Sequence, residues 1–292
     1  MKIVNISGGL GNQMFQYAFL LALRDATGDE VLMDTSKFAT YNLHNGFELD
    51  KVFNISARSA TKEELKRVTR YTENYKLSRI LRKFLPNKKT EVVEPMPTCP
   101  YNSNIFEEAK GDKYYEGIWQ NYKYFDQVRP LILKEFIFQQ PLSEKNTAYS
   151  QKFSNNLTVS MHIRRGDYLL HKNYIGLCGV DYYELAIARV FYKYGLNVNF
   201  AIFSNDMEWC EQNIVPLLHD ATYDLVDWNK GVESYNDMRL MSACRVNIIA
   251  NSSFSWWAAY LNQTPNKEVI APAKWSNMPV QFSRQMPEWT LL

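Results

Sequence analysis

Short apolar runs alternate along this chain with longer amphipathic stretches, and polar or glycine-rich turns separate them. The short runs predict buried strands, and the longer stretches predict helices with one apolar face. We expect strands at residues 3–7, 30–34, 113–120, 158–164, 197–203, 223–226, 246–250 and 268–271. We expect helices at residues 12–26, 62–85, 125–138, 181–194, 207–218, 235–243 and 254–262, the first of them capped by Asn12.

This alternation indicates the fold class. Repeated strand–turn–helix units favour an α/β protein whose parallel sheets carry helices on both faces. A chain of 292 residues is typical of two domains. The polar segment 139–156, which contains Pro141, is the best candidate for the junction, so we expect domains at 1–150 and 151–292. Ligands bind such sheets at the carboxyl ends of the strands.

Composition and charge exclude several classes of protein. With 46% hydrophobic and 22% charged residues, the chain is an ordinary globular protein, and its net charge of +2 excludes the broad basic surface of a general nucleic-acid binder. Its four cysteines are scattered and have no neighbouring histidine cluster, which argues against a disulfide framework or a zinc site. We find no signal peptide and no apolar run of roughly 18 residues that could span a membrane, so we expect a cytoplasmic protein.

Two adjacent arginines follow the strong apolar run at 157–161. Strand alternation places His162 and Arg164 on one face, with Arg165 just beyond them. Guanidiniums so close repel one another, and arginine suits bidentate contact with phosphate, so we expect a diphosphate against Arg164 and Arg165. The alternative is a solvated turn in which both arginines form structural ion pairs.

A second polar loop, Asn251-Ser252-Ser253, lies between a predicted strand and the helix that starts at Phe254. Hydroxyls and backbone amides at a helix N-terminus form an anion site, which the helix dipole strengthens. This loop and the arginine loop could therefore hold a diphosphate from two sides. The simpler alternative is that Ser252 or Ser253 only caps the helix and the tryptophans after it pack into the core.

Three further residues could contact a nucleotide. One carboxylate can accept both N1–H and N2–H of guanine, which makes Asp237 a candidate for base recognition. Ser204 and Asp206 follow a predicted strand and could contact ribose or base. For Asp237 and Asp206 the alternative is a helix-capping role.

The glycine-rich N-terminal loop supports a competing function. Gly9 and Gly11 follow the first strand, and Asp34 ends the second, as in a dinucleotide-binding motif, although a methionine replaces the third glycine. This pattern would suit an NAD-dependent oxidoreductase. The glycines equally suit a loop whose backbone approaches a sugar, with Asn12 and Gln13 offering amides.

Two other features admit more than one interpretation. The segment 76–89 places apolar residues at helical spacing among six cations, and it could rest on an anionic bilayer or pack on its own domain. The aromatic content of 14% could serve a carbohydrate-binding module, but such a module leaves Arg164 and Arg165 unexplained.

Five segments together resemble the α-1,2-fucosyltransferases of glycosyltransferase family 11. The segments are GGLGNQMFQYA (8–18), EGIWQNYKYF (116–125), HIRRGDY (162–168), FSND (203–206) and DMRLMSACRVNIIANSSFSWWAAYL (237–261). The resemblance implies a GT-B-like fold, in which two Rossmann-like domains face each other across a cleft, with the acceptor side N-terminal and the donor side C-terminal. It implies inverting transfer from GDP-L-fucose to a galactose 2-hydroxyl, without a metal or other cofactor, for surface-glycan (O-antigen or capsule) synthesis. Peripheral contact with the inner membrane through 76–89 is a further possibility.

The resemblance also assigns roles to residues. Arg164 matches the arginine that holds the β-phosphate, with Arg165 in support, and His162 and Asp237 match positions near the guanine nucleotide. The other residues that we assign to donor binding are Gly9, Asn12, Gln13, Ser204, Asp206, Asn251, Ser252, Ser253 and Phe254.

The same resemblance leaves the catalytic base open. Arg164 would stabilise the departing GDP, and Asp167 or Glu116 could accept the proton of the acceptor hydroxyl. A weak base, or none, would suffice if departure of the leaving group is far advanced. The segment FSND departs from the family at Asn205, where acidic residues are common.

Overall fold

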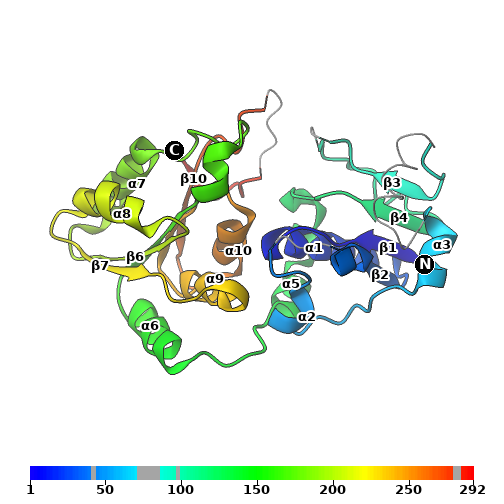
Figure 1. Cartoon of the computed structure of the whole chain (residues 1–292), viewed down its shortest axis with the longest axis horizontal. Helices are drawn as coiled ribbons and strands as arrows, with labels where there is room; N and C mark the ends of the chain where they lie inside the picture. The colour runs from blue at the N-terminus through cyan, green and yellow to red at the C-terminus, as the bar shows by residue number, and fades with distance from the viewer. Residues whose placement is uncertain (41–43, 71–85, 97–98, 279–283) are drawn as a thin grey trace. The chain divides into compact units, whose positions relative to one another are not determined.

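The structure is a computed structural model that describes residues 1–40, 44–70, 86–96, 99–278 and 284–292 (Figure 1). The chain divides into two compact units, Met1–Gln139 and Gln140–Leu292, and each is built on a parallel sheet. The division falls at the start of the polar segment 139–156, and the predicted boundary at 150 lies inside a helix, α6 (Glu144–Asn155). The predicted α/β class with parallel sheets is confirmed.

The first unit contains a four-stranded sheet in the order β2-β1-β4-β3. Its strands are β1 (Lys2–Asn5), β2 (Val31–Asp34), β3 (Glu91–Val93) and β4 (Lys113–Glu116), and its helices are α1 (Leu10–Thr27), α2 (Leu49–Val52), α3 (Lys62–Val68) and α5 (Arg129–Glu135). Helix α1 is buried along most of its length, because its sequence is apolar almost all round.

The start of α1 differs from the prediction. Gly9 is the N-cap, and the helix begins at Leu10, so Asn12 lies within the first turn and does not cap it. The helix ends where Gly28 adopts a φ of 67°, and its amide donates to the Arg24 carbonyl, an ending for which glycine is favoured.

The second unit contains a six-stranded sheet in the order β10-β9-β8-β5-β6-β7. Its strands are β5 (Thr158–Ile163), β6 (Asn199–Ser204), β7 (Thr222–Val226), β8 (Val246–Ile248), β9 (Glu268–Ala271) and β10 (Thr290–Leu291). Besides α6, its helices are α7 (Val180–Tyr194), α8 (Met207–Asn213), α9 (Tyr235–Met241) and α10 (Ser253–Leu261).

Helices cover both faces of this sheet (Figure 1). Val159, Met161 and Ile163 of β5 pack into a core with residues of α7 and α8. The opposite face is polar at its centre: Asn247 of β8 donates to the Ser160 hydroxyl at 2.7 Å and to the carbonyl of Met241, the last residue of α9, at 2.8 Å. The alternation along β5 therefore sends apolar side chains to one helical layer and small polar ones to the other.

Several predicted elements are shorter or were missed. The predicted strand at 113–120 ends at Glu116, because Gly117 packs closely against Glu94 and Trp119 has a φ of 50°. Sequence patterns missed β3, β10, α2 and α6. Most of the segment 76–89 lies outside the described residues. All four cysteines are free thiols, and no helix in the described ranges is long and apolar enough to cross a membrane.

Candidate functional site

Two loops follow neighbouring strands at one edge of the second sheet. We call them the arginine loop, which contains Arg164 and Arg165, and the serine loop, Asn251-Ser252-Ser253. Strands β5 and β8 pair in parallel, with Met161 opposite Ile248, so the loops that follow them both begin at the carboxyl edge of the sheet. The loop after β6 emerges beside them, because Ile163 lies opposite Ser204. The fold thus brings together three segments that are separated by up to about 90 positions in the sequence.

Arg164 lies at the centre of this edge and is partly exposed. Its Nη2 contacts Asp167 Oδ1 at 2.6 Å, and its guanidinium carbon lies 5.3 Å from the centroid of the Tyr168 ring. Asp167 is 62% exposed, so water weakens this pair and an anionic ligand can replace the carboxylate. Arg164 is therefore the arginine of this edge that is placed to bind an anion.

Arg165 has a different environment. Its Nε contacts Asp206 Oδ2 at 3.0 Å, and its guanidinium carbon lies 3.9 Å from the Trp209 ring centroid. Its backbone amide donates to Asn205 Oδ1 at 2.9 Å. Arg165 thus forms the structural ion pair that the alternative predicted, and its contact with a diphosphate stays a prediction.

The loop after β6 is shaped by its own side chains. Asp206 is the N-cap of α8 and accepts from the Trp209 amide at 3.3 Å, while its other oxygen contacts Arg165. Ser204 Oγ accepts from the Asp206 amide at 3.0 Å. The capping role proposed as the alternative for Asp206 is confirmed, and the predicted contact of Ser204 and Asp206 with a nucleotide stays a prediction.

The serine loop forms the N-terminus of α10. Ser252 is buried and is the N-cap, and its Oγ accepts from the Phe254 amide at 3.3 Å. Ser253 and Phe254 are partly exposed and form the first turn, where amides and the helix dipole favour an anion. Asn251 is buried and donates to the Trp275 carbonyl at 3.1 Å, so its side chain supports the loop from within.

His162 lies beneath these loops. It is 8% exposed, its ring centroid is 5.9 Å from that of Phe254, and its Nδ1 has no hydrogen-bond partner among the described residues. Burial, with a smaller contribution from the charge of Arg164, lowers the pKa of His162 to about 3. The imidazole is therefore neutral at physiological pH and adds no charge to the site.

Asp237, in the first turn of α9, is held by a residue that sequence patterns did not single out. Its Oδ1 accepts from Asn229 Nδ2 at 2.8 Å. Burial raises the pKa of Asp237 to about 7, the bond from Asn229 lowers it, and the charge of Asp227 raises it further. Asn229 is held in turn by Asn146 of α6, whose Nδ2 donates to Asn229 Oδ1 at 2.8 Å. This contact could not be predicted, because α6 itself was missed.

Gln13 of the first unit has a structural role. Its Nε2 donates to the carbonyls of Gly8 and Gly46, each at 2.8 Å, and its Oε1 accepts from the Glu48 amide at 3.0 Å. The side chain is fully buried, so the expectation that its amide is offered to a ligand is wrong. Asn12 is partly exposed, and its Oδ1 accepts from Gln120 Nε2 at 2.7 Å.

The glycine-rich loop around Gly9 lies against another loop of the same unit. A Cβ added at Gly9 would lie 3.4 Å from the ring of His44, which is tight but not prohibitive. Gly8 has a φ of 81°, a backbone conformation that favours glycine. The glycines thus serve the entry into α1, and contact of Gly9 with a sugar stays a prediction.

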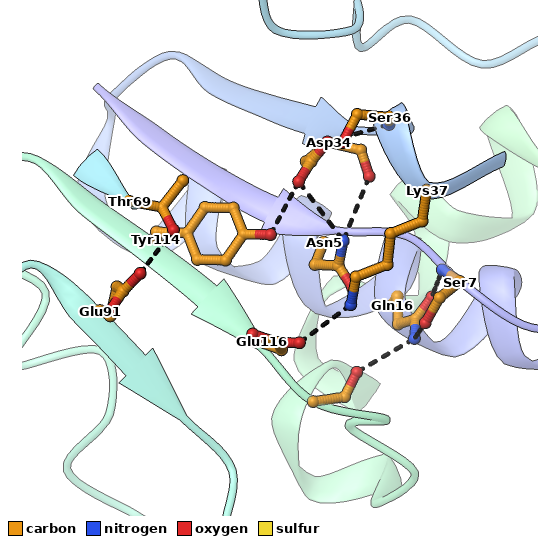
Figure 2. Close-up of polar contacts among 11 residues, drawn as sticks. Asn5, Ser7, Gln16, Asp34, Ser36, Lys37, Thr69, Glu91, Tyr114 and Glu116 are labelled. Carbon is orange, nitrogen blue, oxygen red and sulfur yellow. Dashed lines mark hydrogen bonds and ion pairs between the residues drawn. The ribbon is translucent and has the colours of Figure 1, made fainter. Parts of the chain in front are cut away.

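Asp34 is occupied by its neighbours within the protein (Figure 2). It is 4% exposed; its Oδ2 accepts from the Tyr114 hydroxyl at 2.7 Å and its Oδ1 from the Ser36 amide at 2.9 Å. A ribose partner in an NAD site must offer this carboxylate to a hydroxyl of the ligand. The oxidoreductase alternative therefore loses the acidic residue on which it depended.

Glu116, at the end of β4, forms an ion pair that the sequence patterns did not predict. Figure 2 shows Lys37 reaching across the carboxyl edge of the first sheet, where its Nζ contacts Glu116 Oε1 and Asn5 Oδ1, each at 2.9 Å. The side chains of Lys37 and Glu116 are each about one-fifth exposed, at 23% and 21%, so this carboxylate is accessible to a ligand hydroxyl.

Comparisons with known proteins show the family to which the chain belongs. The family model described as "Glycosyl transferase family 11" matches residues 1–292. An Escherichia coli α-1,2-colitosyltransferase is 32% identical over 281 residues, which cover 94% of this chain and 91% of that protein. The E. coli O-antigen biosynthesis glycosyltransferase WbnK is 33% identical over 290 residues, covering 92% and 93%. Mouse galactoside α-(1,2)-fucosyltransferase 2 is 27% identical, covering 88% and 67%.

Solved structures support the fold. The structure of NodZ α-1,6-fucosyltransferase, a Bradyrhizobium protein, soaked with GDP-fucose has a TM-score of 0.52 at 15% identity, covering 91% of this chain and 96% of that chain. At this identity the likeness concerns the fold, and it confirms the predicted GT-B-like class.

Proposed function

The chain belongs to glycosyltransferase family 11, and on that premise we propose that it transfers L-fucose from GDP-L-fucose to the 2-hydroxyl of a terminal galactose, with inversion. The names of its relatives support this proposal: one is a galactoside α-(1,2)-fucosyltransferase and another an α-1,2-colitosyltransferase. A third acts in O-antigen biosynthesis, so we place the product in surface-glycan synthesis, where the acceptor could be bound to a membrane lipid.

The observation that carries the proposal is the pairing of two loops at one sheet edge. Arg164, which contacts the exposed Asp167, lies on the loop after β5, and the start of α10 lies on the loop after the neighbouring strand β8. A guanidinium and a helix N-terminus are the two groups that best bind a diphosphate. We therefore propose that the β-phosphate replaces Asp167 on Arg164 and that the first-turn amides of α10 bind the same diphosphate.

The proposed reaction has one bond broken and one formed at the anomeric carbon. The bond between that carbon and the phosphate oxygen breaks, and its electron pair leaves on GDP, where Arg164 and the α10 amides stabilise the growing charge. The acceptor oxygen attacks the opposite face of an oxocarbenium-like carbon, which inverts the configuration. These charges supply the electrostatic stabilisation, so we propose that transfer needs no metal ion.

We propose Glu116 as the group that takes the acceptor proton. Asp167, the other candidate, is bound to Arg164 at 2.6 Å and is displaced only when the diphosphate takes its place. Glu116 is accessible at the carboxyl edge of the first sheet, and a carboxylate within hydrogen-bond reach of a hydroxyl can accept its proton.

Base recognition is proposed for Asp237. A guanine offers N1–H and N2–H in the geometry of one carboxylate, and Asn229 holds Asp237 from the protein side. Buried carboxyl groups are costly to keep charged, so a ligand that supplies two donors is the natural partner of the ionised form.

One experiment tests the proposal as a whole. The protein is incubated with GDP-L-fucose or GDP-colitose and a panel of β-galactosides, with and without EDTA, and the products are analysed for linkage and anomeric configuration by NMR. We expect an α-1,2-linked fucosyl galactoside that forms equally in EDTA. Transfer to another hydroxyl, or transfer from neither donor, would overturn the assignment, and a strong preference for GDP-colitose would replace the donor.

A further inference from the structure

One tyrosine side chain contacts both loops of the proposed diphosphate site. Tyr168 lies four residues after Arg164, and its ring centroid is 5.3 Å from the Arg164 guanidinium carbon. At its other end, the Tyr168 hydroxyl donates at 3.4 Å to the carbonyl of Asn251, the residue before the N-cap Ser252. The aromatic face thus contacts the arginine loop and the polar end contacts the serine loop.

The orientation of this ring is set by two further aromatic side chains. Tyr174 stacks on Tyr168 with centroids 4.6 Å apart and an interplanar angle of 25°, and His171 stacks on Tyr174 at 4.7 Å and 27°. Offset stacking restricts the rotation of a ring about its own bonds, so the plane offered to Arg164 is defined before any ligand binds. The guanidinium therefore meets a fixed surface on one side.

The hydroxyl of Tyr168 stays protonated and can therefore act as a hydrogen-bond donor at neutral pH. Burial raises the pKa of Tyr168 to about 12, against the opposing effects of the Arg164 charge and the Ser252 bond. The hydroxyl consequently keeps its proton at neutral pH, and its partners lie at the N-cap of α10. Any shift of the serine loop relative to β5 would break this link.

We propose that Tyr168 is a positioning residue that couples the two diphosphate-binding loops. It holds the Arg164 guanidinium over its ring after the phosphate has displaced Asp167, and it holds the Ser252 cap so that the α10 amides stay directed at the same anion. This inference rests on the proposed function, because it requires that the two loops share one diphosphate. Preorganised donors of this kind lower the reorganisation that charge development requires.

A purely structural role for Tyr168 is the competing explanation, and the chain offers a matched control. Tyr182 is also buried, and its hydroxyl donates to the carbonyls of Ile249 and Ile270 at 2.7 and 3.2 Å, in the same unit and from α7. Tyr182→Phe therefore loses a tyrosine hydroxyl bond to backbone near β8 without touching Arg164 or Ser252. The effect of Tyr182→Phe therefore reports the change in protein stability that follows from losing a tyrosine hydroxyl.

The test measures GDP affinity by calorimetry and transfer kinetics for Tyr168→Phe, Tyr168→Leu and Tyr182→Phe, together with their melting temperatures. Tyr168→Phe keeps the ring under Arg164 but loses the hydroxyl, so we expect about fivefold weaker GDP binding. Tyr168→Leu loses both contacts and should weaken binding by roughly thirtyfold. Tyr182→Phe should lower the melting temperature and leave the GDP dissociation constant within about twofold of wild type.

A double-mutant cycle separates coupling from two independent effects. Combining Tyr168→Phe with Ser252→Ala should cost less than the product of the single losses, because both changes loosen the same serine loop at the start of α10. If folded Tyr168→Phe and Tyr168→Leu proteins bind GDP like wild type, the inference fails while the proposed function stands. If the wild-type protein itself does not bind GDP, the proposed function fails first.

Discussion

At the scale of single residues, the proposed chemistry depends most on the guanidinium of Arg164. Its contact with Asp167 is short but solvent-exposed. In the ligand-free protein the guanidinium is therefore not held in a buried ion pair, and an anion can displace the carboxylate. The adjacent Arg165 carries the same charge and yet is bound to Asp206 and Trp209. Two identical neighbours in the sequence therefore have unequal roles.

The Arg164→Ala variant should lose about 100-fold in turnover with GDP-L-fucose, the effect of removing one donor from a developing anion. Steady-state kinetics at saturating acceptor measure this loss. Arg189→Ala is the control, because Arg189 forms an exposed ion pair with Glu268 at 3.0 Å on the outside of α7. Near-normal turnover in a folded Arg164→Ala protein would contradict the diphosphate role.

If Asp237 binds guanine as proposed, the affinity for GDP should depend on pH. Burial raises the pKa of this carboxyl to about 7, and guanine binds the deprotonated form, so binding should release a proton at and below neutral pH. We expect affinity to fall by about tenfold per pH unit below 7 relative to Asp237→Asn. Taking the ratio of the two proteins cancels the ionisation of the phosphate, and His162, with a pKa of about 3, does not titrate in this range. Parallel pH profiles from calorimetry would remove Asp237 from the base pocket.

Glu116 should act in turnover and not in donor binding. Glu116→Gln is expected to lower kcat by about 100-fold while GDP affinity stays unchanged, because a general base contributes to proton transfer alone. Glu91→Gln serves as the control: this partly buried carboxylate lies at the other end of the neighbouring β3 and accepts from the Lys88 amide at 2.8 Å. Figure 2 shows its contact with Thr69. If kcat in Glu116→Gln is normal, the proton leaves through another group or directly to water.

At the scale of elements, the carboxyl edges of both sheets are built by bonds between loops. The glycine-rich entry into α1 is an example, since Gln13 links the carbonyls of Gly8 and Gly46 with the amide of Glu48. A single buried amide satisfies backbone groups of two segments that are distant in the sequence, one at Gly8 and one at Gly46 and Glu48. The shape of this loop therefore depends on a side chain that does not need to meet a ligand.

Gln13→Leu should destabilise the protein by about 2 kcal/mol or more, because it leaves buried backbone groups without partners in a site of similar volume. Urea unfolding measures the change, and Asn12→Ala is the control, since Asn12 is partly exposed and its Oδ1 has a single side-chain donor, Gln120. Equal stability of the two variants would show that water replaces the lost bonds of Gln13.

At the scale of the whole molecule, each unit has its own parallel sheet and its own apolar core. The proposed diphosphate and guanine contacts belong to the second unit: their residues come from the loops after β5, β6 and β8 and from the start of α9. A ligand at this site should therefore stabilise one unit directly.

Hydrogen exchange tests that assignment. With GDP at about 100 times its dissociation constant, binding adds about 2.7 kcal/mol to the stability of the liganded state. We expect slower exchange at 162–168 and 251–261 and no direct protection at 8–18, which serves as the internal control. Stronger protection at 8–18 would move the nucleotide to the glycine-rich loop.

Much of the fold could be predicted because the relevant signals are local. The alternation of apolar runs and amphipathic stretches predicts β1, β2, β5, β6, β7, β8 and β9 to within a few residues. It missed α6, because this helix is mostly polar, buries Asn146 and Phe153, and has no strong apolar face. It missed β3 and β10, because strands of three and two residues carry too little pattern.

The candidate site shows the same limit. Residue order alone places Arg164 and Ser252 after strands, and parallel pairing then brings them to one edge. Which arginine faces that edge depends on Asp206 and Trp209, some 40 positions later, and the partner of Asp237 depends on Asn146, much earlier in the chain. Asp34 shows the same dependence. The dinucleotide-binding pattern predicts a ribose partner for its carboxylate, but the carboxylate is bound by Tyr114, which lies 80 positions away on another strand.

The local order of residue types was thus enough to predict most of the strands and helices and the loops that follow the strands, because periodicity and turn residues act over a few positions. The choice among equivalent side chains came from folding, because hydrogen bonds, ion pairs and burial depend on distance in space. Tyr168 belongs to the second group: its importance follows from touching Arg164 and the Ser252 loop at once, and no pattern within its own segment contains that fact.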